Sequence, residues 1–444
     1  MKRKLLTLSN PVREKLKLPM LKSLVPEIAG SATPTFTRSS AQTVMGYAEA
    51  DVAGAAQRLL TIPAGVPCCA GARFIASNNT WSNVLADGSA IPKAITQGVL
   101  FEGTGTNLKT NSESFELWST LASPRGTTVS VNAALSPNGE MTADLIIPVA
   151  SYGGHSRYDG FVGAVNTTYT FSVWLKAGGY NYAAISLENS GFPSTSRVLI
   201  DLVNGVIITG TYTNTTAYTI FSGKNGWYRV STQNTSDSDG GPYIPVIEIW
   251  TSSKPVLFTG DGVSGVYAFG ADVKAANFLS SYIATTTAAA SRAATVLSYP
   301  TLNNIASGQF TIALEFTPTH TPSGTIYLWG SYVDANNGTY LLHDGTNLIL
   351  RKRIGGTNYD ATIVNPFVAN QMYRIVAKSS HNGMNTMLDG KLGTMNSNSS
   401  PAQLGTTFEV GSDGQGGNQP FAYIKDLKHY SKALSVSKMS GVSL

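Results

Sequence analysis

Alternating apolar and polar residues recur along most of the chain. Residues 168–178, TYTFSVWLKAG, place Tyr, Phe, Val and Leu on one face of an extended segment, and residues 310–318, FTIALEFTP, do the same with Phe, Ile, Leu and Phe. A period of two positions is typical of a β-strand with one face towards a core. The pattern therefore predicts strands, with one helix candidate at residues 47–60 that Gly54 weakens.

Turn signals separate these segments at short intervals. Asn204-Gly205, Asp344-Gly345 and Asp389-Gly390 lie between apolar runs, where such pairs favour tight β-hairpins. An Ala/Thr/Ser-rich linker, residues 284–295, divides the strand-rich region into two series. Strands at this spacing without intervening helices predict an all-β fold of two antiparallel, jelly-roll-type β-sandwiches.

The chain is predicted to have four parts. Residues 1–30 form a basic arm, 31–98 a connector that packs on its neighbours, 99–292 the first sandwich and 293–444 the second. The arm is expected to anchor the protein to a larger assembly through its basic residues, which are Lys2, Arg3, Lys4, Arg13, Lys15, Lys17 and Lys22. The arm carries the whole net charge of +5, so the remainder is neutral.

Composition narrows the possible classes of protein. A neutral remainder argues against a specific nucleic-acid-binding domain. The two cysteines, Cys68 and Cys69, are adjacent and do not make a disulfide framework, which fits assembly in a reducing cytoplasm. No apolar run is long enough for a membrane span, and the N-terminus lacks the apolar run of a signal peptide.

A search for catalytic motifs gives no strong candidate, so no enzyme activity and no catalytic residue are predicted. G-x-S-x-G, H-E-x-x-H and the paired acids of strand-borne glucanases are missing. The five histidines lie far apart in the sequence: His155, His320, His343, His381 and His429. Asp237 and Asp239 fit a solvated turn better than a calcium loop, so no cofactor is predicted and calcium lacks a full ligand motif.

Sugar binding requires less than catalysis, namely exposed aromatic rings with amides and carboxylates nearby. Trp174 and Trp329 are candidate stacking residues, and Asp413 and Asn418 in a Gly-rich loop are candidate polar contacts. The alternative for both tryptophans is packing beneath loops or against another subunit. The basic run of residues 351–353 fits either a charged, protected sheet edge or an anionic ligand.

Residues 98–119, GVLFEGTGTNLKTNSESFELWS, resemble the opening of a module common in tailed-phage structural proteins, and they are interpreted as the lead-in to the first sandwich. Downstream, NGEMTADLI, TYTFSVWLKAG and NGWYRVS match the same module in order, and PTFTRSSAQTV upstream resembles the segment that precedes this module in phage proteins. The family usually has an Arg before T-N-L, where this chain has Gly105. Residues 306–440 resemble the laminin-G/concanavalin A-like fold through FTIALEFTP, MLDGKLG and FAYIKDLKHYSKAL.

These resemblances imply a phage virion appendage of the head-fibre, decoration or tail-fibre type, with a carbohydrate-binding-like first sandwich. They imply a homo-oligomer, with a trimer favoured, joined through its arm to capsid, portal or tail proteins. The expected location is the virion surface, after assembly in the bacterial cytoplasm, and the expected partner is a host-surface glycan or protein. The alternatives are a polysaccharide depolymerase or esterase tailspike, and a decoration or collar protein without a ligand.

Overall fold

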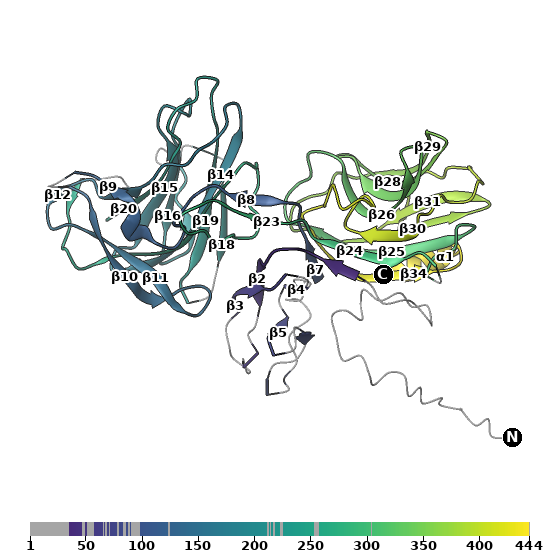
Figure 1. The fold of residues 1–444 in the computed structure, drawn as a ribbon, viewed down its shortest axis with the longest axis horizontal. Coiled ribbons are helices and arrows are strands. Elements are labelled where there is room, and N and C mark those ends of the chain that lie inside the picture. Colours follow the sequence, from purple (N-terminus) through teal and green to yellow (C-terminus); the bar gives the residue numbers. More distant parts are fainter. Residues whose placement is uncertain are drawn as a thin grey trace.

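The structure, a computed structural model, describes residues 35–443 apart from 47–48, 51–56, 65, 67–68, 71, 78–79, 83–85, 88, 90–97, 123–124, 211–212, 214, 216–217, 223–224, 253–256 and 303. The basic arm and its seven cationic residues lie outside the described residues, and the anchoring prediction stays a prediction. The fold is nearly all-β, as predicted, and forms two antiparallel β-sandwiches side by side (Figure 1).

The first sandwich pairs two sheets within the described chain. One sheet has the order β10 (Thr127–Leu135), β11 (Met141–Pro148), β22 (Gly265–Lys274), β14 (Thr168–Gly178), β19 (Tyr228–Thr235) and β18 (Tyr218–Ser222). The facing sheet has the order β17 (Val206–Ile207), β16 (Ser196–Asp201), β15 (Tyr182–Glu188), β20 (Ile244–Trp250), β13 (Ser156–Tyr158) and β9 (Ser119–Thr120). A 3₁₀ turn, Phe115–Leu117, precedes β9 and buries Phe115.

The second sandwich also pairs two sheets in the part of the chain that is described. One sheet, called the site-bearing sheet because the candidate cleft described below lies on it, has the order β1 (Thr35–Thr37), β24 (Val296–Pro300), β33 (Thr407–Val410), β26 (Ile326–Asp334), β27 (Asn337–His343), β28 (Asn347–Ile354) and β29 (Thr357–Val364). The other has the order β32 (Lys391–Leu392), β31 (Gly383–Leu388), β30 (Tyr373–Ser380), β25 (Phe310–Pro318), β34 (Ala422–Tyr430), β7 (Gly98–Phe101) and β4 (Cys69–Ala70). Helix α1 (Val436–Ser443) packs on β30 and β31.

Short two-stranded ribbons complete the fold. They are β2 (Gln42–Gly46) with β3 (Arg58–Ile62), β5 (Arg73–Ile75) with β6 (Thr80–Ser82), β12 (Tyr152–Gly153) with β21 (Phe258–Thr259), and β8 (Gly105–Asn107) with β23 (Ala290–Arg292). The β8–β23 ribbon lies between the two sandwiches (Figure 1).

The predicted strand alternation is confirmed in the first sandwich. Tyr169, Phe171, Val173 and Leu175 of β14 are buried in its core. The opposite face of β14 is buried as well, because the segment after β22 covers it, and the Thr170 hydroxyl donates to the carbonyl of Ala276 (2.7 Å). The alternation of apolar and polar residues therefore predicted the strand correctly, but it did not predict that the second face of β14 is buried too.

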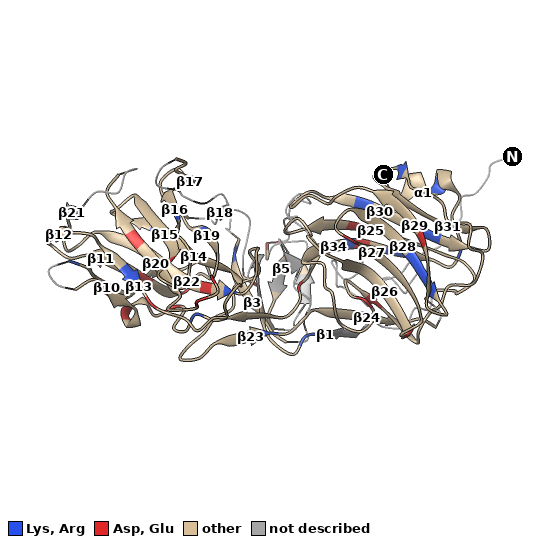
Figure 2. Ribbon diagram, turned by 90° about the horizontal axis from the view of Figure 1, so that it is seen from above, with Lys and Arg blue, Asp and Glu red and all other residues tan. Residues whose placement is uncertain are grey.

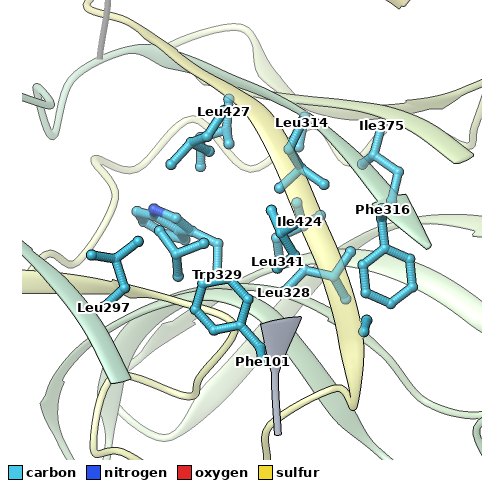
Figure 3. Close-up of a cluster of buried hydrophobic side chains, with 14 of the residues drawn as sticks. Phe101, Leu297, Leu314, Phe316, Leu328, Trp329, Leu341, Ile375, Ile424 and Leu427 are labelled. Atoms are coloured by element: carbon cyan, nitrogen blue, oxygen red, sulfur yellow. The ribbon is translucent and has the colours of Figure 1, made fainter. Parts of the chain in front are cut away.

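The prediction that residues 98–101 open the first sandwich is wrong. This strand, β7, pairs with β34, with Val99 opposite Ile424, and belongs to the second sandwich. Figure 3 shows Phe101 among the core side chains of that sandwich, near Trp329 and Leu328. All four residues of β7 are buried, because their short apolar run fits an interior strand.

The connector also contributes strands, so the predicted boundaries at residues 98 and 99 do not separate the domains. β1 pairs with β24, and β4 pairs with β7, both within the second sandwich. The chain leaves that sandwich after β7, enters the first sandwich through β8, and returns through β23 to β24. The first sandwich is thus an insertion in the second, which suits domains whose ends lie close together.

A buried ion pair lies at this insertion point. The Glu102 carboxylate is 3.0 Å from the Arg292 guanidinium, and both side chains are almost fully buried. Glu102 also accepts hydrogen bonds from Gln42 Nε2 (2.6 Å), Ser281 N (2.9 Å) and Ser281 Oγ (2.6 Å). Burial alone would raise the pKa of Glu102, but Arg292 and Ser281 outweigh it and lower this pKa. The carboxylate therefore stays charged and joins the connector, β7 and the returning linker.

Replacement of Phe101 by Ala tests the membership of β7. Because Phe101 is fully buried in the second core, we expect Phe101→Ala to cost about 3–5 kcal/mol of that domain's unfolding free energy. Denaturant unfolding, monitored with a probe placed in each domain, measures the change in each domain's unfolding free energy, and calorimetry measures the same loss of stability. The matched control, Phe171→Ala, removes a buried ring of the first core and should destabilise that domain instead. A loss from Phe101→Ala confined to the first sandwich would contradict the assignment.

Candidate functional site

The two tryptophans predicted to stack on sugars are buried. Trp174 is 2% exposed and packs with Trp227, Phe269 and Tyr282. Trp329 is fully buried, and its ring centroid lies 5.5 Å from that of Phe408 in the second core. Neither ring offers a face to a ligand, so the prediction of exposed stacking on them is wrong and the packing alternative holds.

The other two predicted residues, Asp413 and Asn418, lie together in the loop of residues 411–419. Asp413 Oδ1 accepts from the backbone N–H groups of Gln415 (2.9 Å) and Gly417 (3.1 Å), and Oδ2 accepts from Asn418 Nδ2 (2.8 Å). The Asn418 carbonyl accepts from the N–H of Tyr327 on β26 (3.1 Å). Both residues therefore shape a loop and attach it to the sheet, which differs from the direct sugar contact predicted for them.

This loop forms one wall of an open cleft of about 290 Å³ on the outer face of the β26–β29 sheet. The lining residues come from three strands and two loops; they are Tyr327, Tyr332, Asp334, Ala335, Tyr340, Arg351, Arg353, Asp413 and Gln415. Figure 2 shows the cationic residues of β28 on this sheet in blue. The cleft combines aromatic rings, hydroxyls, guanidinium groups and carboxylates.

Strand register places these side chains in rows. Tyr340 on β27 lies opposite Arg351 on β28, and Gly338 lies opposite both Arg353 and Tyr332. Ile349 and Leu342 continue the same face and pack with Tyr340 and Tyr327 as its apolar floor. Because β27 pairs with β26 and β28, the register fixes the relative positions of these side chains.

Two glycines allow close packing around the cleft. A Cβ on Gly338 would lie 2.1 Å from the phenolic oxygen of Tyr340, so a side chain there would displace that ring. Gly414 has a φ of +89°, and its added Cβ would lie 2.7 Å from the N of Tyr332. The loop can therefore approach β26 closely only with glycine at position 414.

Tyr327 and Tyr340 remain protonated at neutral pH. Burial raises the pKa of Tyr340 to about 12, and burial also raises the pKa of Tyr327. The two rings meet edge to face with centroids 5.6 Å apart. Tyr327, which is partly exposed, can present its ring and phenol to a ligand, whereas Tyr340 is buried and supports it.

The cleft carboxylates are engaged by their own turns. Asp334 accepts from the N–H of Asn336 (2.7 Å) and from Asn337 Nδ2 (3.0 Å). Asp413 is held as described above. Two carboxylates that flank a bond are needed for ordinary glycoside hydrolysis, and here both act as turn acceptors.

Sequence reasoning missed the tyrosines of the cleft. Tyr327 and Tyr340 sit in the apolar stretches TIYLWGSY and TYLLHDG, where they resemble core residues. The signal that identifies them is cross-strand register, since Leu341 and Leu328 are buried in the core while Tyr340 and Tyr327 project from the other face. A pairing of the two strands around the turn at Asn336 would have revealed it.

A larger cavity of about 490 Å³ lies beside the junction, lined by residues that include Thr106, Lys274, Phe278 and Phe421. Its one cationic side chain among the lining residues, Lys274, binds Asp272 (2.6 Å) and the Ser281 carbonyl (2.5 Å). Its charge is therefore already matched, and the cleft on β26–β28 offers more recognition chemistry.

Groups of three or more His, Cys, Asp or Glu residues placed to hold a metal are not found among the described residues. Asp237 accepts from the N–H of Asp239 (3.1 Å) in a turn. In the same part of the chain, no helix combines the length and the apolar character of a membrane span.

The profile of the family described as the concanavalin A-like lectin/glucanases superfamily matches residues 252–440. This range contains the site-bearing sheet except β1, and it also extends into β22 of the inserted sandwich. The match agrees with the sandwich fold of the second domain. No curated protein matches the sequence.

Several solved structures align with about a third of the chain. Domain 4 of AbnA, an extracellular arabinanase from Geobacillus stearothermophilus in complex with arabinotriose, is 19% identical with a TM-score of 0.30, over 34% of this chain and 73% of that one. The receptor-binding domain of botulinum neurotoxin C/D mosaic serotype is 14% identical with a TM-score of 0.29, over 34% and 40%. A SAP-like pentraxin from Limulus polyphemus is 18% identical with a TM-score of 0.26, over 32% and 72%.

Replacement of Asp413 by Ala tests its role as the organiser of the loop. Loss of its acceptors leaves the N–H groups of Gln415 and Gly417 without their partner, so we expect their hydrogen exchange to accelerate about tenfold or more. Asn418→Ala is the control, because it removes a side-chain donor to Asp413 and keeps the hydrogen bonds from the backbone N–H groups of Gln415 and Gly417. Unchanged amide exchange in Asp413→Ala would contradict this role.

Proposed function

We propose that this protein binds glycans and holds the saccharide in the cleft formed by Tyr327, Tyr332 and Tyr340. One observation carries the proposal: the partly exposed Tyr327 and Tyr332 and several charged groups share an open cleft on the sheet, with Tyr340 buried beneath it. A sugar presents apolar C–H faces and a rim of hydroxyls, which match aromatic rings beside hydrogen-bonding groups. The family profile over the second sandwich, which names lectins and glucanases, supports this proposal.

The state of the cleft carboxylates favours binding over hydrolysis. Asp334 and Asp413 each accept hydrogen bonds from neighbouring residues in their own turns, and the bonds from Asn337 and Asn336 lower the pKa of Asp334. A general acid needs a raised pKa and a free oxygen near the glycosidic oxygen. Release of oligosaccharide from a bound polysaccharide would instead favour the depolymerase alternative.

We further propose that the glycan-binding chain is an appendage of a phage virion, oligomeric and with a trimer favoured. Support comes from the ordered sequence motifs between residues 35 and 292 and from a cysteine-poor, all-β chain. In this proposal the basic arm binds other virion proteins, and the sandwiches project towards the surface of the host. No cofactor is required for this function.

Replacement of Tyr327 by Ala tests glycan binding. Loss of the ring removes a stacking surface and a phenolic donor, so we expect binding on a glycan array to weaken about tenfold or more. Tyr327→Phe should retain most of the binding because it keeps the ring. The distant control is Tyr152→Ala, an exposed tyrosine of the first sandwich. Equal glycan binding by Tyr327→Ala and the wild type would show that the cleft is not the glycan-binding site.

Deletion of residues 1–30 tests the anchoring role separately. Without the seven basic residues of the arm, we expect both sandwiches to remain folded and to bind glycan, while the protein no longer joins particles. Co-sedimentation with virions, with circular dichroism as the folding check, measures this. Continued incorporation would remove the anchoring role and leave the glycan site unaffected.

A further inference from the structure

Three consecutive cationic residues, Arg351, Lys352 and Arg353, lie on β28. Protection of a sheet edge does not explain them, because β29 pairs along β28 on one side and β27 on the other. The charges therefore occupy an interior strand, where cations without partners are costly. The contacts of each of the three cationic side chains show whether its charge has a partner.

Two of the three cations have partners. Lys352 points to the core side and is fully buried, and its Nζ donates to the carbonyls of Asn398 (3.0 Å) and Ser400 (2.6 Å). Arg351, on the cleft side, forms a two-pronged ion pair with Asp360 across the strands (2.8 and 2.7 Å). Both side chains are held in place by these bonds.

Arg353 is different. It lines the cleft beside Tyr332 and Tyr340, and no carboxylate among the described residues lies within ion-pair distance of it. Its Nε is buried without a hydrogen-bond partner. The residues opposite it are Gly338 on β27 and Asn358 on β29, neither of which carries charge.

The surroundings of Arg353 leave room for a ligand. Arg353 lines the open cleft of about 290 Å³, and beside it the Tyr340 ring packs over the backbone of Gly338. The positive charge of Arg353 acts on Tyr327 and Tyr340, because it lowers the pKa of both phenols, although burial has a larger and opposite effect. The cleft carboxylates, Asp334 and Asp413, are occupied by their own turns.

We propose that Arg353 anchors the acidic group of an anionic glycan, with a carboxylate-bearing sugar as the ligand class. A guanidinium presents paired N–H donors that match the two oxygens of a carboxylate, and partial burial strengthens that bond. The tyrosines hold the sugar ring while Arg353 selects its charge. This inference rests on the proposed glycan-binding function of the same cleft.

The test uses the full-length protein and a panel of hexuronate polysaccharides, namely polygalacturonate, alginate and hyaluronate, each with its carboxyl-reduced neutral counterpart. The wild type should bind at least one acidic form about tenfold or more tighter than the reduced form, and this preference should weaken with salt. Arg353→Gln should bind both forms equally, and Arg353→Lys should keep part of the preference. Lys391→Gln, at an exposed cation of the other sheet, should behave as the wild type.

The outcomes separate the two proposals. Equal binding of acidic and neutral forms by the wild type, or a preference that persists in Arg353→Gln, overturns the role of Arg353 and leaves glycan binding intact. Loss of both forms in Tyr327→Ala, with only the acidic preference lost in Arg353→Gln, supports both. Failure of the wild type to bind any member contradicts glycan binding for this class, and the role of Arg353 with it.

Discussion

The placement of the two sandwiches depends on the buried ion pair of Glu102 and Arg292. Glu102 directly follows the last strand that the chain contributes to the second sandwich before leaving it, and Arg292 lies on the strand that brings it back. A buried pair of this kind is stable only when further hydrogen bonds satisfy its remaining atoms. Gln42 and Ser281 do so for the carboxylate, and the Gly103 carbonyl accepts from Arg292 Nη2 (2.8 Å). The two segments by which the chain leaves and re-enters the second sandwich are therefore held together at this ion pair.

A second polar group continues this junction into the inserted sandwich. Asp272 accepts from Arg229 (3.1 Å) and from Lys274 (2.6 Å), and all three side chains are buried. Lys274 in turn donates to the Ser281 carbonyl, next to the atoms that bind Glu102. The polar network thus extends from the connector through the linker into the first sandwich, where an apolar contact alone would leave the relative angle less defined.

The sequence predicted the local structure well and the assignment of strands to domains less well. Alternation in β14 and β25 reports which residues face a core, because that property depends on neighbours in the chain. It does not report which sheet a short strand joins, so β7 was attached to the segment that follows it. The burial of Trp174 depends on Tyr282 and Trp227, and the cleft depends on register across β26–β28. Such long-range relations leave little trace in a local pattern.

The pairing of β7 with β34 also has a consequence for the newly made chain. Val99 is synthesised before its partner Ile424, and the whole inserted sandwich is synthesised between them. Until that partner leaves the ribosome, the apolar segment GVLF can pair only with the two-residue strand β4, while the inserted sandwich between β7 and β34 can already be complete. Unpaired apolar strands promote aggregation. Biosynthesis therefore includes an interval in which β7 lacks its partner β34, and a chaperone that shields residues 98–101 would act during that interval.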